Sequence, residues 1–449
     1  MRIIQILPGV GNQFYCENCI RDQALVRELR ARGHDAMVVP LYLPLAPAPS
    51  DSPGETPLFF GGINVYLKQK WPWIGRLPAW LTRPLDSRPV LRLAASLAGM
   101  MDPEDLGETT VSMLRGEQGR QAEDLERLID WLRDAAQRPD VVCLSDVLLA
   151  GFARRIKAEL GVPVVCLLQD EDSFLDELPP PYREAAWETL RERSADIDAF
   201  FAASVYFRDL MLPRLALRPE RVHVVPTGIP LAGCEPAAAP PEPPVLGFLS
   251  RQCEGKGLDL LVDAFLALRR TRGLERLRLR LIGGHTPQDR RFLRALRRRI
   301  AAAGAAADVE WHPNCPREER IPLLRSMTVL SVPQRWREAS GIFVLEALAC
   351  GVPVVLPRHG VFPELLDLTG GGTLFEPGSA PDLSRALESL LAAPDRAREL
   401  GRHGAEAVRR RFSVEAMAGE FVRVCEGLRP GAAAAAPARP AGAPGTAPE

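Results

Sequence analysis

Two glutamates, Glu338 and Glu346, stand eight residues apart in the segment REASGIFVLEALACGVP. The run from Ile342 to Cys350 is apolar on every side of a helix except at Glu346, so we expect this carboxylate to lie in packed surroundings, where it needs a partner. A carboxylate only accepts hydrogen bonds, so vicinal sugar hydroxyls would satisfy Glu346 without an ion pair. A buried salt bridge to an arginine such as Arg358 is the alternative.

The segment around Glu338 also has the features of an anion-binding helix start. Glu338 follows the strand-like run TVLSVP, and Ser340 and Gly341 can open a helix that ends at Gly351. The free backbone amides at the start of such a helix suit a phosphate or a diphosphate. The sequence therefore predicts a carboxylate and an anion site beside the carboxyl end of one strand.

Two basic residues follow another strand-like run. The loop after VLGFLS reads RQCEGKGLDLL, which would place Arg251 and Lys256 at the mouth of the same site. Lys256 is one of only four lysines among 56 basic side chains, which suggests that a compact ammonium group matters here more than a guanidinium fork. Two cations opposite helix amides would neutralise a diphosphate. The alternative is an ordinary solvated charge before a helix.

The elements that would position these side chains are short β-branched runs that alternate with amphipathic helical runs. RIIQIL, IRDQALVRELRARG and DAMVVPLYL open the pattern, which resumes after an irregular insert and again after a segment rich in proline and alanine. Such alternation indicates parallel βαβ units. We therefore predict two doubly wound, Rossmann-like α/β domains that face a central cleft, with ligands beyond the carboxyl ends of the strands.

The domain limits follow from the changes in composition. The prediction, in chain order, is an N-terminal Rossmann-like domain at 1–228 with the insert at about 44–116, a linker at 229–244, a C-terminal domain at 245–412, a closing helix at 413–428 and a disordered tail at 429–449.

The overall composition limits the kinds of partner. With 46% hydrophobic and 25% charged residues, the 449-residue chain is typical of a globular protein with two domains. A formal net charge of −1 gives no overall attraction to nucleic acid. The amino terminus has only a short apolar run, no run is long enough to span a membrane, and the nine scattered cysteines do not resemble a disulfide framework. We predict a cytoplasmic protein.

Four segments together carry a family resemblance. SRQCEGKGLDLLVDAF, LRLIGG, REASGIFVLEALACGVPVV and GVFPELL resemble, in order and in spacing, the retaining GT-B glycosyltransferases of family 4, the group 1 type. The resemblance covers essentially the whole C-terminal domain. The first half is similar in outline, through the glycine loop PGVGN and the run RVHVVPTGI.

The resemblance implies that the C-terminal domain binds the nucleotide sugar and that the N-terminal domain lies on the acceptor side. It also implies roles for matching residues. Glu338 and Glu346 match the E-x7-E motif of the family, which implies that Glu338 contacts hydroxyls of the donor sugar and that Glu346 holds the ribose. Arg251 and Lys256 match the basic pair that binds the diphosphate and stabilises it as a leaving group. The further candidates for donor binding are Ser340, Gly341, Ile342, Gly9, Gly11 and, in the LRLIGG segment, Gly283.

The chain departs from the family at two places. Ala339-Ser340-Gly341 stands where many members have Gly-Phe-Gly, so we expect contacts to the donor sugar to differ. After VPVVCLL, where the family often has a histidine near the donor sugar, this chain has Gln169, which cannot take up a proton as histidine does. A GT-B protein that binds a nucleotide sugar or glycan without turnover is therefore the alternative function.

Two further patterns suggest a metal or a reactive thiol. Asp170 to Asp172 spell D-x-D, but the two-sheet organisation argues against the other main glycosyltransferase fold, and we expect no metal. Cys16 and Cys19 form C-x-x-C where a helix begins, which could stabilise a thiolate. A thiol or metal protein acting through this pair is a second alternative, although a packed pair of thiols is favoured.

The insert contains a basic and aromatic stretch. Residues 56–85 include no acidic side chain, and within 67–85 lysines and arginines interleave with three tryptophans. This mixture suits a membrane interface or a carbohydrate platform, or else a lid packed on the first domain. Two predictions therefore stay open: a peripheral contact with the inner face of the membrane, and a carbohydrate or lipid-linked acceptor.

Taken together, these patterns predict a hexosyltransferase-like glycosyltransferase. It would transfer a sugar from a nucleotide-diphosphate sugar to an acceptor, with retention and without metal or cofactor. Catalysis would rest on positioning and on electrostatic stabilisation of the departing diphosphate.

Overall fold

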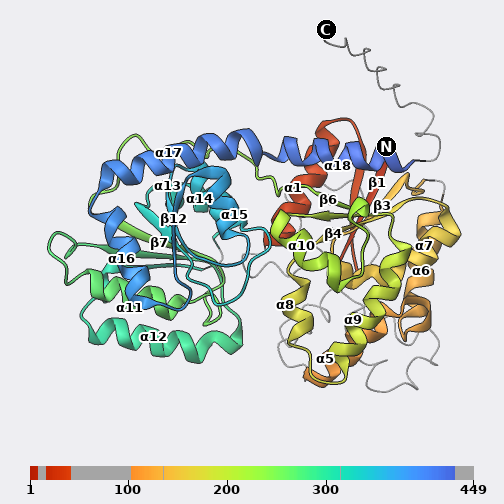
Figure 1. Cartoon of the computed structure of the whole chain (residues 1–449), viewed down its shortest axis with the longest axis horizontal. Coiled ribbons are helices and arrows are strands. Elements are labelled where there is room, and N and C mark those ends of the chain that lie inside the picture. The colour runs from red at the N-terminus through yellow and green to blue at the C-terminus, as the bar shows by residue number, and fades with distance from the viewer. Residues whose placement is uncertain (9–16, 42–102, 135, 314, 430–449) are drawn as a thin grey trace, which may run out of the picture.

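Two six-stranded sheets, one in each of two lobes, form the framework of the protein (Figure 1). The computed structural model describes residues 1–8, 17–41, 103–134, 136–313 and 315–429. All strand pairs within both sheets are parallel. The strand orders are β2-β1-β3-β4-β5-β6 and β12-β11-β10-β7-β8-β9, which confirms the prediction of two doubly wound α/β domains.

The N-terminal sheet consists of short, buried strands, as expected for a parallel sheet covered on both faces. Its strands are β1 (Arg2–Leu7), β2 (Asp35–Pro40), β3 (Val141–Leu144), β4 (Val164–Leu168), β5 (Ala199–Ala202) and β6 (Val222–Val224). The helices of this domain are α1 (Glu17–Ala31), α5 (Pro103–Leu114), α6 (Ala122–Arg133), α7 (Ala153–Leu160), α8 (Glu171–Asp176), α9 (Tyr182–Arg193) and α10 (Val205–Arg214).

The C-terminal domain repeats this plan. Its strands are β7 (Val245–Leu249), β8 (Arg278–Ile282), β9 (Val309–His312), β10 (Val329–Ser331), β11 (Val354–Pro357) and β12 (Gly372–Phe375). Its helices are α11 (Leu258–Leu268), α12 (Arg290–Ala302), α13 (Arg317–Arg325), α14 (Ile342–Ala349), α15 (Phe362–Thr369), α16 (Ala380–Leu391) and α17 (Pro394–Arg411), and α18 (Val414–Leu428) follows.

Alternate residues of the N-terminal strands pack against different helices, because successive side chains of a strand point to opposite faces. On β3, Val142 and Leu144 belong to a core that includes side chains of α6, α7 and α9. Val141 and Cys143 belong to a second core, formed with α1 and α18. Helix α18, the last helix among the described residues, therefore completes the core of the first domain.

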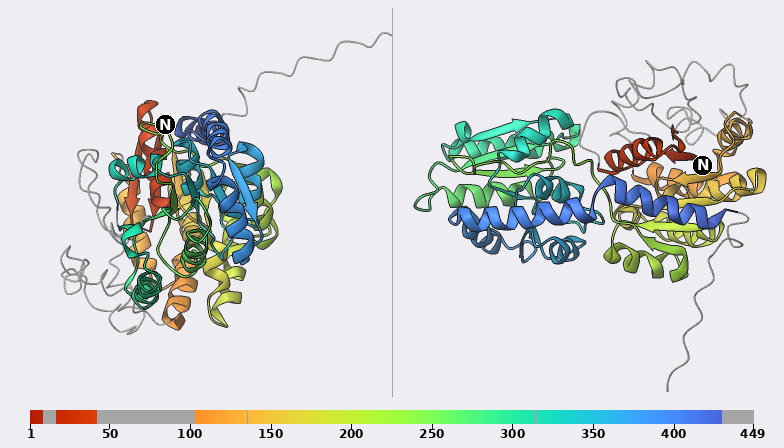
Figure 2. Two further views of the ribbon diagram at one scale, coloured as in Figure 1. Left: turned by 90° about the vertical axis from the view of Figure 1, so that its left-hand side faces the viewer. Right: turned by 90° about the horizontal axis from the view of Figure 1, so that it is seen from above.

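The chain crosses between the lobes twice, at adjacent positions. The backbone amide of Ile229 donates to the carbonyl of Phe412 at 2.9 Å, and the amide of Val414 donates to the carbonyl of Ile229 at 3.2 Å. After the second crossing, α18 lies on the N-terminal lobe while α17 lies on the C-terminal lobe (Figures 1 and 2). The two crossings thus form a paired connection.

The predicted insert at 44–116 falls largely outside the described residues. Its final part contains helix α5, so this region is not irregular throughout. Residues 430–449 of the predicted tail also lie outside the described part of the chain. No helix among the described residues is long and apolar enough to cross a membrane.

The strand order of the C-terminal sheet locates a ligand site. Strands β7 and β10 are neighbours, with Leu246 opposite Val329, although the chain runs outward from them in opposite directions along the sheet. At such a topological switch point the loops beyond the strands diverge and leave room for a ligand. The loops after β7 and β10 carry the predicted residues Lys256 and Glu338.

Candidate active site

An ion pair joins the two loops at this switch point. Nζ of Lys256 lies 3.1 Å from Oε2 of Glu338, whose side chain is only 4% exposed. Gln334 completes the group, because its Oε1 accepts from Lys256 at 2.9 Å and its Nε2 donates to Glu338 at 3.1 Å. The structure therefore brings together two predicted residues and adds Gln334, which no motif had marked.

Helix α14 begins beside this ion pair. Gly341 has a φ of +66°, a left-handed conformation that favours glycine, and the helix starts at Ile342. Ser340 precedes this turn, and the helix ends before Gly351, as the sequence predicts. The geometry places the positive end of the helix next to Lys256 and Glu338.

Two carboxylates of the N-terminal domain contact this loop. Oε2 of Glu17, on the first turn of α1, accepts a hydrogen bond from the backbone amide of Ile342 at 2.8 Å. Oδ1 of Asp170 accepts one from the amide of Ala339 at 2.7 Å. Neither contact could be read from the sequence, where Asp170 stood out only as part of D-x-D.

Charges at the site are unequal, with three carboxylates around one ammonium group. Burial alone would lower the pKa of Lys256, but Glu338, Glu17 and Asp170 outweigh it and raise that pKa. Burial alone would raise the pKa of Glu338, but the ammonium of Lys256 outweighs it and lowers that pKa. Burial, and after it the charge of Glu338, raises the pKa of Glu17 and of Asp170 well above their usual values.

The Lys256–Glu338 pair is therefore ionised at neutral pH, whereas Glu17 and Asp170 take up protons more readily than ordinary carboxylates. Such displaced pKa values are typical of functional sites.

Arg251 has a different position from Lys256. Its Nε and Nη2 each donate to the carboxylate of Asp289 at 3.2 Å, and Nη2 also donates to Oγ1 of Thr286 at 3.2 Å. These bonds tie the guanidinium to the start of α12, and its side chain is partly exposed. Arg251 thus lies in the predicted loop but outside the Lys256–Glu338 ion pair.

Glu346 has a protein partner, contrary to the expectation of a carboxylate without an ion pair. Arg320 on α13 donates from Nη2 and Nε to its two oxygens at 2.8 and 3.1 Å. The arginine considered beforehand, Arg358, instead pairs with Glu376 at the surface. The reason is that α13 packs against α14, a tertiary contact that spacing along α14 cannot reveal. Each carboxylate oxygen can still accept another hydrogen bond.

Gln169 and Gly283 have structural contacts. The side-chain amide of Gln169 donates to the carbonyl of Ser145, and its backbone amide donates to Glu171 at 2.7 Å, so the residue links the loops after β3 and β4. Gly283 has a φ of +127°, and a Cβ there would lie 2.0 Å from the carbonyl oxygen of Ser250. Glycine at this position therefore allows two backbone segments to approach each other closely.

Several predictions remain without a structural test. Gly9, Gly11, Cys16 and the stretch 67–85 lie outside the described residues, while Cys19 lies near the start of α1. Within the described ranges, no group of three or more His, Cys, Asp or Glu side chains is arranged to hold a metal ion.

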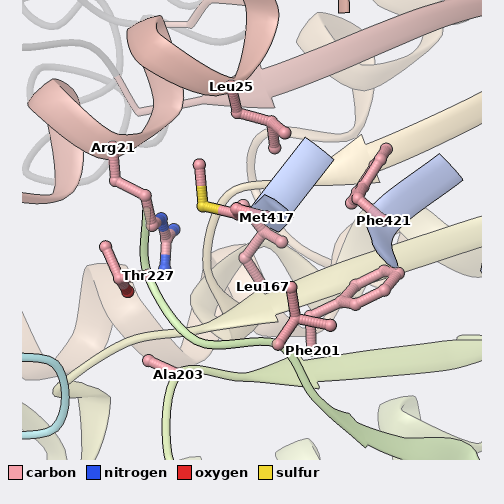
Figure 3. Close-up of a pocket in the computed structure, with 9 residues that line it drawn as sticks. Arg21, Leu25, Leu167, Phe201, Ala203, Thr227, Met417 and Phe421 are labelled. Atoms are coloured by element: carbon pink, nitrogen blue, oxygen red, sulfur yellow. The ribbon is translucent and has the colours of Figure 1, made fainter. Parts of the chain in front are cut away.

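A small pocket lies elsewhere, where α18 packs on the N-terminal sheet. Figure 3 shows Met417 and Phe421 of α18 on one side of it and Arg21 and Thr227 near each other on another. Apart from these two polar side chains the lining is apolar, which suits a packing gap better than a sugar site. The lining residues are Arg21, Leu25, Leu167, Phe201, Ala203, Val225, Thr227, Met417 and Phe421.

Solved structures share this architecture across both lobes. Sucrose-phosphate synthase from Thermosynechococcus elongatus superposes with a TM-score of 0.70 at 17% identity, covering 95% of this chain and 99% of that one. Anabaena HepE in complex with UDP superposes with a TM-score of 0.66 at 14% identity, covering 95% and 100%. These likenesses confirm the predicted GT-B fold.

Two family models account for most of the sequence. One, described as glycosyl transferases group 1, matches residues 235–407, and another, described as a glycosyl transferase 4-like domain, matches residues 21–228. The chain belongs to the group 1 glycosyltransferases of family 4, as the resemblance in the sequence had indicated.

Curated relatives match over part of their length. A D-inositol 3-phosphate glycosyltransferase of Segniliparus rotundus is 29% identical over 278 residues, which are 59% of this chain and 60% of that protein. A GDP-mannose-dependent alpha-(1-6)-phosphatidylinositol monomannoside mannosyltransferase of Mycolicibacterium smegmatis is 35% identical over 165 residues, which are 35% of this chain and 41% of that protein. The chain thus spans about half the length of these relatives.

Proposed function

We propose that the protein transfers a sugar from a nucleotide-diphosphate sugar to a carbohydrate or lipid-linked acceptor, with retention at the anomeric carbon and without a bound metal. The observation that carries this proposal is the Lys256–Glu338 ion pair at the start of α14. Its Nζ–Oε2 distance is 3.1 Å, and it joins the loops after β7 and β10 at the switch point of the sheet. Ligands of doubly wound sheets bind at such points.

In the proposed mechanism, electrostatics make the nucleoside diphosphate a better leaving group. Its negative charge grows as the bond to the sugar breaks, and preorganised cations and amides stabilise developing charge in a site shielded from water. The ammonium of Lys256, kept charged by the surrounding carboxylates, and the backbone amides at the start of α14 would supply that stabilisation. Arg251 would act from the edge of the site, where Asp289 holds it.

The two glutamates of the E-x7-E motif would bind the donor. Glu338 would accept hydrogen bonds from hydroxyls of the donor sugar, with its carboxylate oriented by Lys256 and Gln334. Glu346 would accept from the ribose while Arg320 fixes its orientation. Positioning of this kind contributes to catalysis by bringing the reacting atoms into line.

The similar proteins support a nucleotide sugar as the class of donor. The mannosyltransferase relative is named for GDP-mannose and a phosphatidylinositol mannoside, and HepE has been solved with UDP-glucose. Because these names differ in base, sugar and acceptor, the proposal extends to the class of donor and not to one donor.

A GT-B protein that binds a nucleotide sugar without turnover is a second candidate. Gln169 favours it, because this amide cannot take up a proton and is bound to the carbonyl of Ser145. Release of nucleoside diphosphate from any nucleotide sugar would exclude this function.

The proposal is tested by thermal unfolding in the presence of UDP, GDP or ADP. A ligand at about 100 times its dissociation constant stabilises the folded state by ~2.7 kcal/mol, which is visible as a shift in Tm. We expect one nucleotide to shift the wild type, and Glu346→Ala to lose most of that shift. The shift is compared within each protein, because the variant also removes the carboxylate that pairs with Arg320. Absence of a shift with all three nucleotides would contradict the proposal.

A further inference from the structure

The contact between Glu17 and α14 joins residues of different domains. Glu17 begins the first helix of the N-terminal domain, and its Oε2 accepts from the amide of Ile342, 325 positions later in the chain, at 2.8 Å. Its side chain is partly buried and lies near Lys256, Glu338 and Asp170, whose charges all act on it. A carboxylate therefore occupies the positive end of α14.

The carboxylate of Glu17 lies where the proposed function places the diphosphate of the donor. The inference rests on that function, in which the diphosphate binds to the amides of α14 and to Lys256. The carboxylate of Glu17 already accepts from the first of these amides and is attracted by the same ammonium. A diphosphate and an ionised Glu17 would thus compete for the same hydrogen-bond donor and the same cation.

We propose that Glu17 belongs to the donor site, where its carboxylate fills the place of the diphosphate in the ligand-free protein and leaves that place when the donor binds. The contact holds the two domains together at the start of α14. The contact weakens the affinity for nucleoside diphosphates, because the ligand must displace the carboxyl oxygen that accepts from the amide of Ile342.

The surrounding charges give this competition a dependence on pH. Burial and the charge of Glu338 raise the pKa of Glu17, Asp170 acts in the same direction, and Lys256 opposes them. A raised pKa means that Glu17 holds its proton more firmly in the contact than after displacement, so the contact loses stability as pH rises through that pKa. The affinity lost to Glu17 is therefore largest at low pH.

The experiment measures the dissociation constant of the nucleoside diphosphate by titration calorimetry for wild type, Glu17→Gln and Glu364→Gln. Glutamine keeps the shape of Glu17 but carries no charge. Glu364 is the matched control, because its carboxylate also bridges the domains, accepting from the amides of Val205 and Tyr206 at 2.9 and 2.8 Å, but at the start of α10. Values of Tm confirm that the variants are folded.

We expect Glu17→Gln to bind the nucleotide roughly tenfold more tightly than wild type at about pH 6, with the difference shrinking towards about pH 8.5. Glu364→Gln should stay within about twofold of wild type at both values. The phosphate of the ligand titrates equally with all three proteins, so the difference between proteins isolates Glu17.

The outcomes separate the inference from the function beneath it. If wild type binds a nucleotide but Glu17→Gln binds it no more tightly, the inference is wrong and the proposed function stands. An equal gain in affinity with Glu364→Gln also overturns it, because the effect would then come from loosening the domain contact. If none of the proteins binds a nucleoside diphosphate, the proposed function fails and the inference fails with it.

Discussion

Glu346 shows how much a buried carboxylate depends on its partner. Its side chain is 2% exposed and that of Arg320 is 6% exposed, so both charges have been removed from water. An ion pair of this kind contributes little net stability compared with apolar residues, but loss of one partner leaves the other charge buried and uncompensated. Arg320 is therefore important for the stability of the C-terminal domain as well as for the orientation of Glu346.

Replacement of Arg320 with alanine should lower the free energy of unfolding by about 3–5 kcal/mol, measured by chemical denaturation. The matched control is Arg358→Ala, because Arg358 pairs with Glu376 where both side chains are more than half exposed. That change should cost no more than about 1 kcal/mol. Equal losses in the two variants would show that the Arg320–Glu346 pair has no special place in the core.

Some residues of the site could be found from the sequence because of their place after a strand, whereas others could not because their partners are on distant elements. Lys256 and Glu338 could be predicted because each follows an apolar run that had to be a buried strand, and parallel strands direct their following loops to one edge. Glu17, Gln334 and Arg320 act through partners on other elements, the most distant being 325 positions away. Such pairings depend on how whole elements pack, so no local pattern marks them.

At the scale of elements, α14 positions the site through its first turn. Gly341 adopts a left-handed conformation, and a Cβ at this position would lie 2.9 Å from Cδ1 of Leu365 on α15. The turn therefore needs both the conformational freedom and the small size of glycine. It directs the amide of Ile342 towards the site.

Replacement of Gly341 with alanine should reduce both stability and nucleotide affinity. A side chain in the left-handed region costs about 1–2 kcal/mol, and the contact with Leu365 would shift the turn and the amide of Ile342. Gly378→Ala is the control, because Gly378 has a similar φ of +75° with nothing within 4 Å of the added Cβ. Denaturation and calorimetry should show a stability loss in both variants but weaker nucleotide binding only in Gly341→Ala. Unchanged affinity in that variant would remove the turn from the donor site.

Most strands were predictable because buried parallel strands read as continuous apolar runs. Strand β12 was missed, since its sequence GTLF is short and only its last residue is buried. Helix α5 was missed because it lies at the end of an insert without a clear helical pattern. The sequence signal was weak for both elements, because β12 lies at the edge of its sheet and α5 is stabilised by packing against other helices of the N-terminal domain.

At the scale of the molecule, polar contacts join the two domains near the proposed donor site. Oγ of Ser204 donates to the carbonyl of Ala339 at 2.9 Å, and the amide of Ala339 donates to Asp170 at 2.7 Å. The sequence predicted two domains from a break in composition, but their relative placement depends on these contacts between distant residues. The loop that would bind the donor is therefore held by both domains.

The central claim is that the protein uses a nucleotide-diphosphate sugar and that Lys256 stabilises the departing diphosphate. The most direct measurement is release of nucleoside diphosphate from UDP-glucose, GDP-mannose and ADP-glucose by wild type, Lys256→Ala and Lys157→Ala. Lys157 is the matched lysine, because it pairs with Asp198 at 2.6 Å on the N-terminal domain. We expect wild type and Lys157→Ala to release the diphosphate from one of these donors at equal rates, and Lys256→Ala to be slower by about 100-fold or more. No release by wild type from any donor, or an equal rate in Lys256→Ala, would contradict the account.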